Sequence, residues 1–298
     1  MFTGSLVALI TPFRQGTIDY STIESLVEWH IQQGTKGIVP CGTTGEALML
    51  SPEERMRLIE TCVQAAAGTV PVIPGTGAMS TEETISLTQQ AKIAGADAVL
   101  IITPWYIKPS QEGLYQHYKA VHDAVKIPII LYNNPGRTSV ELKHETVVKL
   151  AQLPRIIGIK DSSDDLMRPI KTRLDLGSDF CQLAGNDGPI VAFMANGGHG
   201  SISVIANIVP KACADLQEAW QQGDFTTVGR IRDQLHPLCE TLFIETSPGP
   251  IKYAASLLGL CTAELRRPLV AISQAMEEKV KMVLQTAGLL DSFAQRIL

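Results

Sequence analysis

Lys160 is the residue whose surroundings most clearly indicate chemistry. It ends a run at residues 156–160 in which apolar, mostly β-branched residues lead to one lysine, and small polar residues follow from Ser162. That pattern predicts a buried strand with Lys160 at its carboxyl end. Burial disfavours the charged ammonium form, and a neutral lysine amine can attack a carbonyl group to form a Schiff base. A surface lysine just past a strand is the alternative that this run leaves open.

Two further side chains follow another apolar run and could assist such chemistry. Tyr132 ends the run at residues 128–132, and Arg137 lies in the loop after it. A phenol near a Schiff-base lysine can move the protons that imine formation and hydrolysis require. An arginine can hold a carboxylate with two hydrogen bonds. The alternatives are a core tyrosine with one hydrogen bond and an arginine in a surface salt bridge.

Three glycine-rich segments also follow apolar runs. The first, residues 42–46, contains Thr43 and Thr44 and ends in Glu46, shortly before a helix start. Its glycines let backbone N–H groups approach a small anion such as a carboxylate, and its threonine hydroxyls could take part in proton transfer. A plain glycine-rich turn is the alternative. The segments 185–188 and 197–200 are interpreted as giving a site its shape rather than its chemistry.

The elements that must position these residues are short apolar runs that alternate with helical patterns. The runs lack apolar–polar alternation, which is typical of strands buried on both faces of a parallel sheet. Eight strand–helix units predict an α/β fold, a (β/α)8 TIM barrel whose strands all present their carboxyl ends on one face. A doubly wound open sheet is the structural alternative. The runs are residues 5–10, 37–39, 70–73, 98–102, 128–132, 156–160, 180–184 and 200–204.

Helix starts and the C-terminal part of the chain complete the predicted layout. Ser21 and Ser80 are each followed three residues later by glutamate, the spacing of a capping box, and Ser51 precedes a proline at the first helical position. Beyond residue 223 only helical patterns remain, at residues 224–242, 250–258 and 270–284. We therefore predict a catalytic barrel over residues 1–223 and a C-terminal helical domain over residues 224–298.

Composition excludes several other classes of protein. Of the 298 residues 45% are hydrophobic and 18% charged, as in a compact enzyme with a large core. The net charge of -5 comes without basic runs, so neither nucleic-acid binding nor a polybasic membrane patch is expected. The N-terminal residues lack the basic region of a signal peptide, and no apolar run could cross a bilayer, so we expect a cytoplasmic protein. The scattered cysteines and histidines show neither disulfide nor metal-ligand spacing.

Taken together, these motifs resemble the dihydrodipicolinate synthase family of the pyruvate-dependent class I aldolases, in the N-acetylneuraminate lyase superfamily. The resemblance rests on residues 42–46, 132–138 and 158–161, in that order, and extends over nearly the whole chain. It implies a lyase that condenses pyruvate with L-aspartate 4-semialdehyde through a lysine Schiff base, giving 4-hydroxy-tetrahydrodipicolinate for diaminopimelate and lysine biosynthesis. It implies no metal and no organic cofactor.

The resemblance also implies roles for individual residues. Lys160 would form the imine with pyruvate, and Thr43 and Thr44 would hold the pyruvate carboxylate. Tyr132, Thr43 and Tyr106 would form a proton relay, with Tyr106 reaching into the site of a neighbouring subunit.

Two more residues would complete the substrate site. Arg137 would bind the carboxylate of the semialdehyde, and the backbone carbonyl of Ile202 would line the pyruvate site. The expected assembly is a homotetramer built as a dimer of dimers. N-acetylneuraminate lyases and keto-deoxy-sugar-acid aldolases share the lysine and the tyrosine and remain alternatives, as does a non-catalytic pyruvate-binding regulator.

The chain departs from lysine-inhibited members of the family at the positions of their allosteric site. Only Glu83 is kept there. Proline and methionine cannot supply hydrogen bonds to a bound amino acid, and Arg55 would repel its ammonium group. We therefore predict weak or absent feedback inhibition by L-lysine. The positions are Ala47, Pro52, Arg55, Met79, Glu83 and Trp105.

Overall fold

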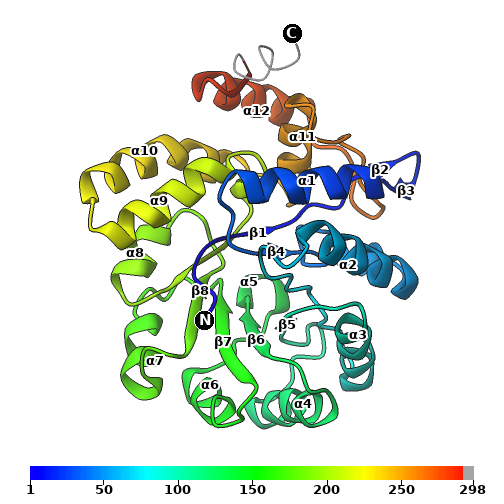
Figure 1. The fold of residues 1–298 in the computed structure, drawn as a ribbon, viewed down its shortest axis with the longest axis vertical. Helices are drawn as coiled ribbons and strands as arrows, with labels where there is room; N and C mark the ends of the chain where they lie inside the picture. The colour runs from blue at the N-terminus through cyan, green and yellow to red at the C-terminus, as the bar shows by residue number, and fades with distance from the viewer. Residues whose placement is uncertain (291–298) are drawn as a thin grey trace.

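A parallel sheet forms the centre of the molecule (Figure 1). The computed structural model describes residues 1–290. Its seven-stranded sheet has the order β4-β1-β9-β8-β7-β6-β5. The strands are β1 Gly4–Ala8, β4 Ile38–Val39, β5 Val99–Ile102, β6 Ile129–Asn133, β7 Ile156–Asp161, β8 Cys181–Ala184 and β9 Gly200–Ser203.

The third predicted run closes the gap between the two edge strands. Val72 forms a parallel bridge with Ile38 of β4, and Gly75 forms one with Leu100 of β5. The eight predicted runs therefore all contribute to one ring of parallel segments. This arrangement confirms the predicted (β/α)8 barrel and excludes the doubly wound open sheet, since such a sheet would leave two free edges.

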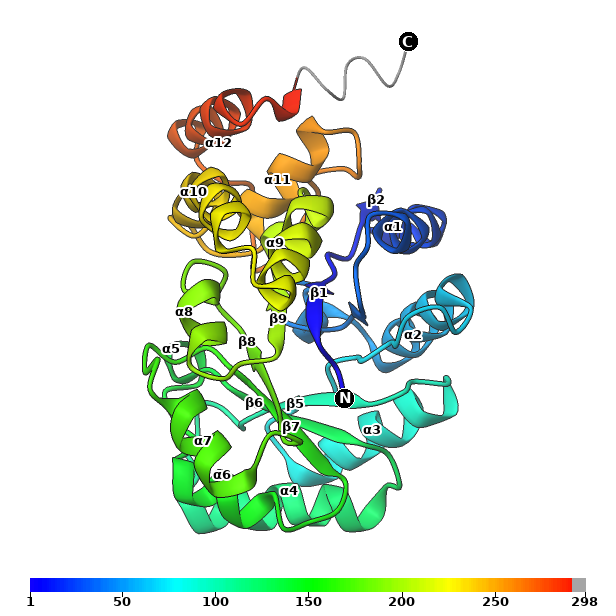
Figure 2. The same cartoon turned by 60° about the vertical axis from the view of Figure 1, so that its left-hand side comes forward.

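Helices surround the barrel, and within residues 1–290 three more follow it in the chain (Figures 1 and 2). The helices before residue 223 are α1 Tyr20–Gln32, α2 Pro52–Ala66, α3 Thr81–Ile93, α4 Gln111–Ala124, α5 Pro135–Thr138, α6 His144–Leu150, α7 Arg168–Leu176, α8 Ile190–Ala195 and α9 Pro210–Gln222. The later helices are α10 Phe225–Thr241, α11 Gly249–Leu257 and α12 Gln274–Thr286. Two 3₁₀ turns, η1 Ala47–Met49 and η2 Ile205–Asn207, and a hairpin of β2 Phe13–Arg14 and β3 Thr17–Ile18 complete the fold.

Two of the three predicted helix starts are confirmed, and one is wrong. Ser51 and Glu54 form a full capping box at α2, and the side chain of Ser80 accepts a hydrogen bond at the start of α3. Helix α1 is capped by Asp19 instead of Ser21. The Asp19 carboxylate accepts the backbone N–H of Thr22 at 3.2 Å. A carboxylate here also neutralises the guanidinium of Arg14 at 2.8 Å, which a serine cannot do.

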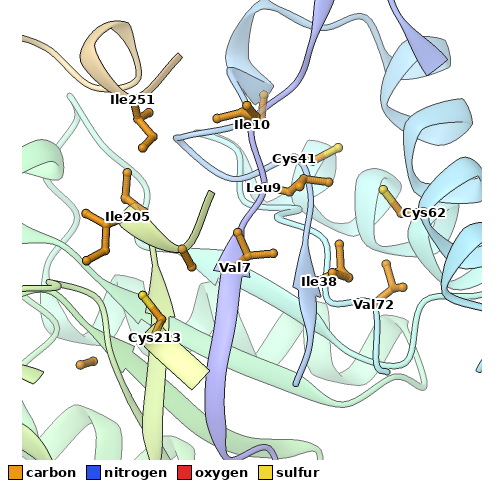
Figure 3. Close-up of a cluster of buried hydrophobic side chains, with 14 of the residues drawn as sticks. Val7, Leu9, Ile10, Ile38, Cys41, Cys62, Val72, Ile205, Cys213 and Ile251 are labelled. Carbon is orange, nitrogen blue, oxygen red and sulfur yellow. The ribbon is translucent and has the colours of Figure 1, made fainter. Parts of the chain in front are cut away.

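Buried side chains form two apolar clusters separated by the sheet. The smaller cluster contains barrel residues such as Leu6, Ile130 and Tyr132, which alternate along their strands with residues of the larger cluster. The larger cluster lies between strands and helices and extends into the C-terminal helices, as Figure 3 illustrates with Ile251 of α11 near Ile205. Barrel and C-terminal helices therefore share one continuous apolar core.

The C-terminal helices pack on one another, and the loop between α11 and α12 contacts the first hairpin. Helix α10 packs against α9 and α12, and α11 packs against α12. The Thr262 hydroxyl donates to the carbonyl of Phe13 at 2.6 Å, and the N–H of Gly16 donates to Glu264 at 2.6 Å. The hairpin itself was not predicted. The division at residue 223 stays a prediction, and residues 291–298 of the predicted C-terminal domain lie outside the described part of the chain.

The structure also describes the cysteines and the apolar character of the helices. All six cysteines lie within the described residues and carry free thiols. Between residues 1 and 290, no helix is long and apolar enough to cross a membrane.

Candidate active site

Lys160 and Tyr132 lie side by side at the carboxyl ends of neighbouring strands. The parallel register of β6 and β7 pairs Tyr132 with Lys160 directly. Lys160 is 5% exposed and Tyr132 7%. The Lys160 Nζ atom lies 4.4 Å from the centre of the Tyr132 ring. The amine and the phenol that the sequence predicted to act together are therefore in contact on one rim of the barrel.

The environment of Tyr132 favours loss of its phenolic proton. Burial alone would raise its pKa, but the positive charge of Lys160 and a hydrogen bond from Asn134 outweigh burial, and the pKa of Tyr132 is lowered. The Asn134 Nδ2 donates to the phenolic oxygen at 2.9 Å. A phenol with a lowered pKa exchanges protons more readily at neutral pH.

Asn134 also positions Arg137. Its side-chain carbonyl accepts the backbone N–H of Arg137 at 3.2 Å, which caps the short helix α5. The guanidinium of Arg137 is exposed, so it is free to meet a ligand from solution. One asparagine thus connects the predicted proton carrier with the predicted carboxylate binder, and the sequence analysis gave this asparagine no role.

A cavity of about 250 Å³ opens at this rim. Its wall includes Thr43, Tyr132 and Arg137, which the sequence predicted as site residues, and Glu46 from the same loop as Thr43. Thr246, Ser247 and Leu269 from the C-terminal part of the chain also line it. The structure therefore brings the hydroxyl, phenol and guanidinium groups around one space that is suitable for a small carboxylate substrate.

The loop at residues 42–46 packs closely against the residues that follow β1. The Thr11 hydroxyl donates to the carbonyl of Gly45 at 2.7 Å. A Cβ atom at Gly45 would lie 2.9 Å from the carbonyl oxygen of Leu9, so only glycine fits there without a shift. Within this loop Thr43 is exposed to the cavity and Thr44 is buried.

Four predicted residues are not part of the cavity wall, namely Lys160, Thr44, Ile202 and Tyr106. Ile202 is fully buried in β9, where it pairs with Leu6. Tyr106 is 84% exposed and has a left-handed backbone, with φ of 67°. It does not line the cavity of its own chain, and its role in the site of a neighbouring subunit stays a prediction.

Gly185 and Asp187 contribute more to the site than the sequence indicated. A Cβ atom at Gly185 would lie 3.0 Å from Cε of Lys160, so the missing side chain makes room for the lysine. The Asp187 carboxylate accepts the backbone N–H groups of Val204 and Ile205 at 2.9 and 3.0 Å, just after β9 ends. Burial raises the pKa of Asp187. The sequence analysis interpreted residues 185–188 as giving the site its shape. The structure extends that interpretation, because Asp187 also fixes the end of the strand that carries Ile202.

Asp161 fixes the chain directly after the lysine. It lies 2.6 Å from the guanidinium of Arg168 and accepts a hydrogen bond from Asn133 at 3.2 Å. The apolar run before Lys160 gave no signal for this contact, because Arg168 lies in the next helix. Among residues 1–290, no group of three or more His, Cys, Asp or Glu side chains is placed to hold a metal ion.

Comparison with known proteins gives one consistent result. The model of the dihydrodipicolinate synthetase family matches residues 1–287. The 4-hydroxy-tetrahydrodipicolinate synthase of Rhodospirillum centenum is 56% identical over 290 residues, which cover 97% of this chain and all of that protein. The crystal structure of dihydrodipicolinate synthase from Aquifex aeolicus has a TM-score of 0.95 and 44% identity, covering 97% of this chain and 99% of the other. The chloride-inhibited enzyme from Acinetobacter baumannii, solved with pyruvate, has a TM-score of 0.94 and 43% identity, covering 97% and 100%.

Proposed function

The chain belongs to the dihydrodipicolinate synthetase family, and we propose that it condenses pyruvate with L-aspartate 4-semialdehyde to 4-hydroxy-tetrahydrodipicolinate. This is a lyase reaction of the class I aldolase type, and its product feeds diaminopimelate and lysine biosynthesis. The observation that carries the proposal is the buried Lys160 amine, which lies 4.4 Å from the ring of Tyr132, a residue that lines one cavity with Thr43 and Arg137. We place the reaction in the cytoplasm, where the precursors of amino acids are made.

The reaction begins with an imine. The Lys160 amine attacks the ketone carbon of pyruvate, and water leaves as the imine forms. The protonated imine accepts the electron pair of a methyl C–H bond when that proton is removed, which gives an enamine. The enamine carbon then attacks the aldehyde of the semialdehyde. The amine of the bound product displaces Lys160 by transimination, and a six-membered ring closes.

Each step needs a proton carried in or out, and the proposed carriers lie close to the amine. Tyr132 gives and takes these protons, with Thr43 and a Tyr106 from a neighbouring subunit as relay partners. Thr43 and Thr44 bind the pyruvate carboxylate through hydroxyl and backbone groups, with the carbonyl of Ile202 on the opposite side. Arg137, which is exposed at the cavity mouth, binds the carboxylate of the semialdehyde.

The first experiment follows oxidation of NADPH when the protein receives both substrates and an excess of the reductase that consumes the product. Turnover that requires both pyruvate and L-aspartate 4-semialdehyde supports the synthase. Borohydride reduction with pyruvate alone should add a covalent mass to wild-type protein and not to Lys160→Ala. Trapping without turnover would indicate a sugar-acid aldolase or N-acetylneuraminate lyase. Absence of both would favour a pyruvate-binding regulator.

We further propose that the protein is a homotetramer, built as a dimer of dimers, in which Tyr106 acts across an interface. The exposure of Tyr106, 84%, and of the adjacent Ile107, 65%, supports a covered position for this segment in an assembly. The test mixes Tyr106→Phe subunits with Lys160→Ala subunits. If Tyr106 acts in the neighbouring site, hybrids regain activity because each Tyr106→Phe subunit receives an intact tyrosine. Lack of any recovery in verified hybrids would contradict the assignment.

A further inference from the structure

A buried ion pair joins the C-terminal helix α11 to the loop that carries Thr43. Lys252 of α11 is 0% exposed and Glu46 is 1% exposed. The Lys252 Nζ atom lies 2.7 Å from Oε1 of Glu46 and donates a second hydrogen bond to the carbonyl of Thr11 at 2.9 Å. The other carboxylate oxygen of Glu46 accepts the backbone N–H of Arg266 at 3.0 Å. Both charges are therefore paired and hydrogen-bonded inside the protein.

Stability alone does not account for such a pair. Removing two charges from water is costly, and apolar residues of similar volume often replace a buried ion pair with no loss of stability. A buried pair does fix the relative position of two segments tightly, because leaving either charge alone is strongly unfavourable. The two segments fixed here are α11 and the loop at residues 42–46, which are about 200 positions apart in the sequence.

The backbone of Glu46 has an unusual conformation, and the contacts of its side chain help to maintain it. Glu46 has φ of 56° and ψ of 32°, the left-handed conformation that residues with a side chain rarely adopt. Its N–H donates to the carbonyl of Thr43 at 3.1 Å, which closes the loop on itself. Such a conformation persists only where the surroundings enforce it, and here Lys252 and the Arg266 backbone hold the side chain from the other side.

We propose that Glu46 and Lys252 are positioning residues that set the geometry of the Thr43–Thr44 loop for pyruvate binding, so that α11 is part of the substrate site. The inference rests on the proposed function, since it names pyruvate as the ligand of that loop. Glu46 lines the same cavity as Thr43, and Thr246 and Ser247 just before α11 line it too. Without the ion pair, the loop relaxes from its left-handed turn and the hydroxyl and N–H groups no longer converge on the carboxylate.

The test separates positioning from stability with a double variant. Glu46→Gln/Lys252→Met removes both charges at nearly constant volume, so its thermal unfolding temperature should stay close to that of the wild type. The rate of borohydride trapping is then measured against pyruvate concentration, a readout that does not need the second substrate. We expect the pyruvate concentration for half-maximal trapping to rise about tenfold or more, because a misplacement of about 1 Å at a site is sufficient for losses of this size.

Controls and a second variant complete the design. Tyr253→Phe removes a hydrogen bond to Glu277 from the next position of α11, and its pyruvate dependence should equal that of the wild type. If the double variant fails to fold, Glu46→Asp decides, because it keeps the charge opposite Lys252 but is one methylene shorter and cannot hold both Lys252 and the Arg266 N–H without moving the loop, so a smaller rise is expected. A folded variant with wild-type pyruvate dependence overturns this inference alone. Wild-type protein that leaves no pyruvate on Lys160 overturns the proposed function with it.

Discussion

At the scale of single residues, the most direct prediction concerns Tyr132. Replacing it with phenylalanine keeps the ring beside Lys160 and removes the proton carrier, so turnover should fall about 10²-fold or more. The measurement is the coupled assay, with borohydride trapping as a second readout of imine formation.

A second buried tyrosine provides the matched control for this substitution. Tyr118 of α4 donates its hydroxyl to the backbone carbonyl of Ile101 in β5 at 3.1 Å, and both residues belong to the larger apolar cluster and not to the cavity wall. Tyr118→Phe should cost about 1 kcal/mol of stability and leave turnover within a factor of two to three. Equal losses of turnover in the two variants would show that Tyr132 has no special role in proton transfer.

A substitution at Gly185 tests how closely the chain packs around Lys160. In Gly185→Ala the new methyl group would lie 1.9 Å from the Ser162 hydroxyl and 3.0 Å from Cε of Lys160. The hydroxyl can rotate away, but Lys160 must move, so imine trapping should slow about tenfold. Gly188→Ala is the control, because nothing lies within 4 Å of its added methyl group. A Gly185→Ala protein that traps pyruvate at the wild-type rate would contradict the close packing.

Some site residues could be predicted from the sequence, and others could not. Lys160 and Tyr132 end apolar runs, and the equal register of parallel strands puts such positions side by side. Asn134, Asp161 and Glu46 were given no role, because each acts through a polar contact with one other residue: the Tyr132 phenol, Arg168 and Lys252 respectively. Hydrophobic periodicity carries no signal for contacts between polar groups, whether two or 206 positions apart.

At the scale of elements, a buried histidine in helix α1 makes the stability of the protein depend on pH. His30 of α1 is fully buried, its Nδ1 lies 3.2 Å from the Thr35 hydroxyl, and burial lowers its pKa to about 3. In the unfolded chain the same ring has a pKa of about 6.5 and binds a proton that the folded state excludes. Stability is therefore fully present above pH 6.5 and declines as the pH falls towards 3, by at most about 1.4 kcal/mol per pH unit from this group.

The corresponding experiment compares wild type with His30→Leu at a fixed protein concentration. Denaturant unfolding is measured from pH 4.5 to pH 7.5. The variant should be less stable at neutral pH, because Thr35 loses its partner, but its stability should fall less steeply with acid. His117, whose pKa burial lowers to about 4, remains in both proteins as a common background. Parallel curves for the two proteins would mean that His30 does not cause the acid sensitivity.

Elements marked by an uninterrupted apolar run were predicted well, and short elements without such a run were not. All eight barrel runs form strands or bridges because doubly buried parallel strands require uninterrupted apolar residues. The hairpin at residues 13–18 has strands of two residues each, too short for a period to appear. The start of α1 was misplaced because Asp19 and Ser21 are both good capping residues, and only the contact with Arg14 decides between them.

At the scale of the whole molecule, the prediction concerns feedback control by L-lysine. L-lysine should not reduce the rate of turnover appreciably, even at millimolar concentration. Arg55 occupies one position of the family's inhibitor site, and both its Nε and Nη2 atoms donate to the carbonyl of Ala47, at 2.9 and 2.6 Å. The guanidinium is thus held in place and repels the ammonium group of an incoming lysine.

The measurement is the initial rate of the coupled assay against L-lysine concentration, with calorimetric titration as a check for binding without inhibition. The reductase alone, supplied with product, is the control for effects on the coupling enzyme. Saturable inhibition that disappears when Glu83 is replaced would contradict the prediction, since Glu83 is the one family residue retained at this site.

The pairing of β1 with β9 has a consequence for the order in which the chain can fold on the ribosome. Residue 8 ends β1 and residue 203 ends β9, so at about 5 to 20 residues per second β1 waits roughly 10 to 40 s for its partner. Lys252, which holds the Glu46 loop, emerges later still. A nascent chain therefore carries Lys160 well before it has a finished site around it, and the complete site forms only in the last stage of synthesis.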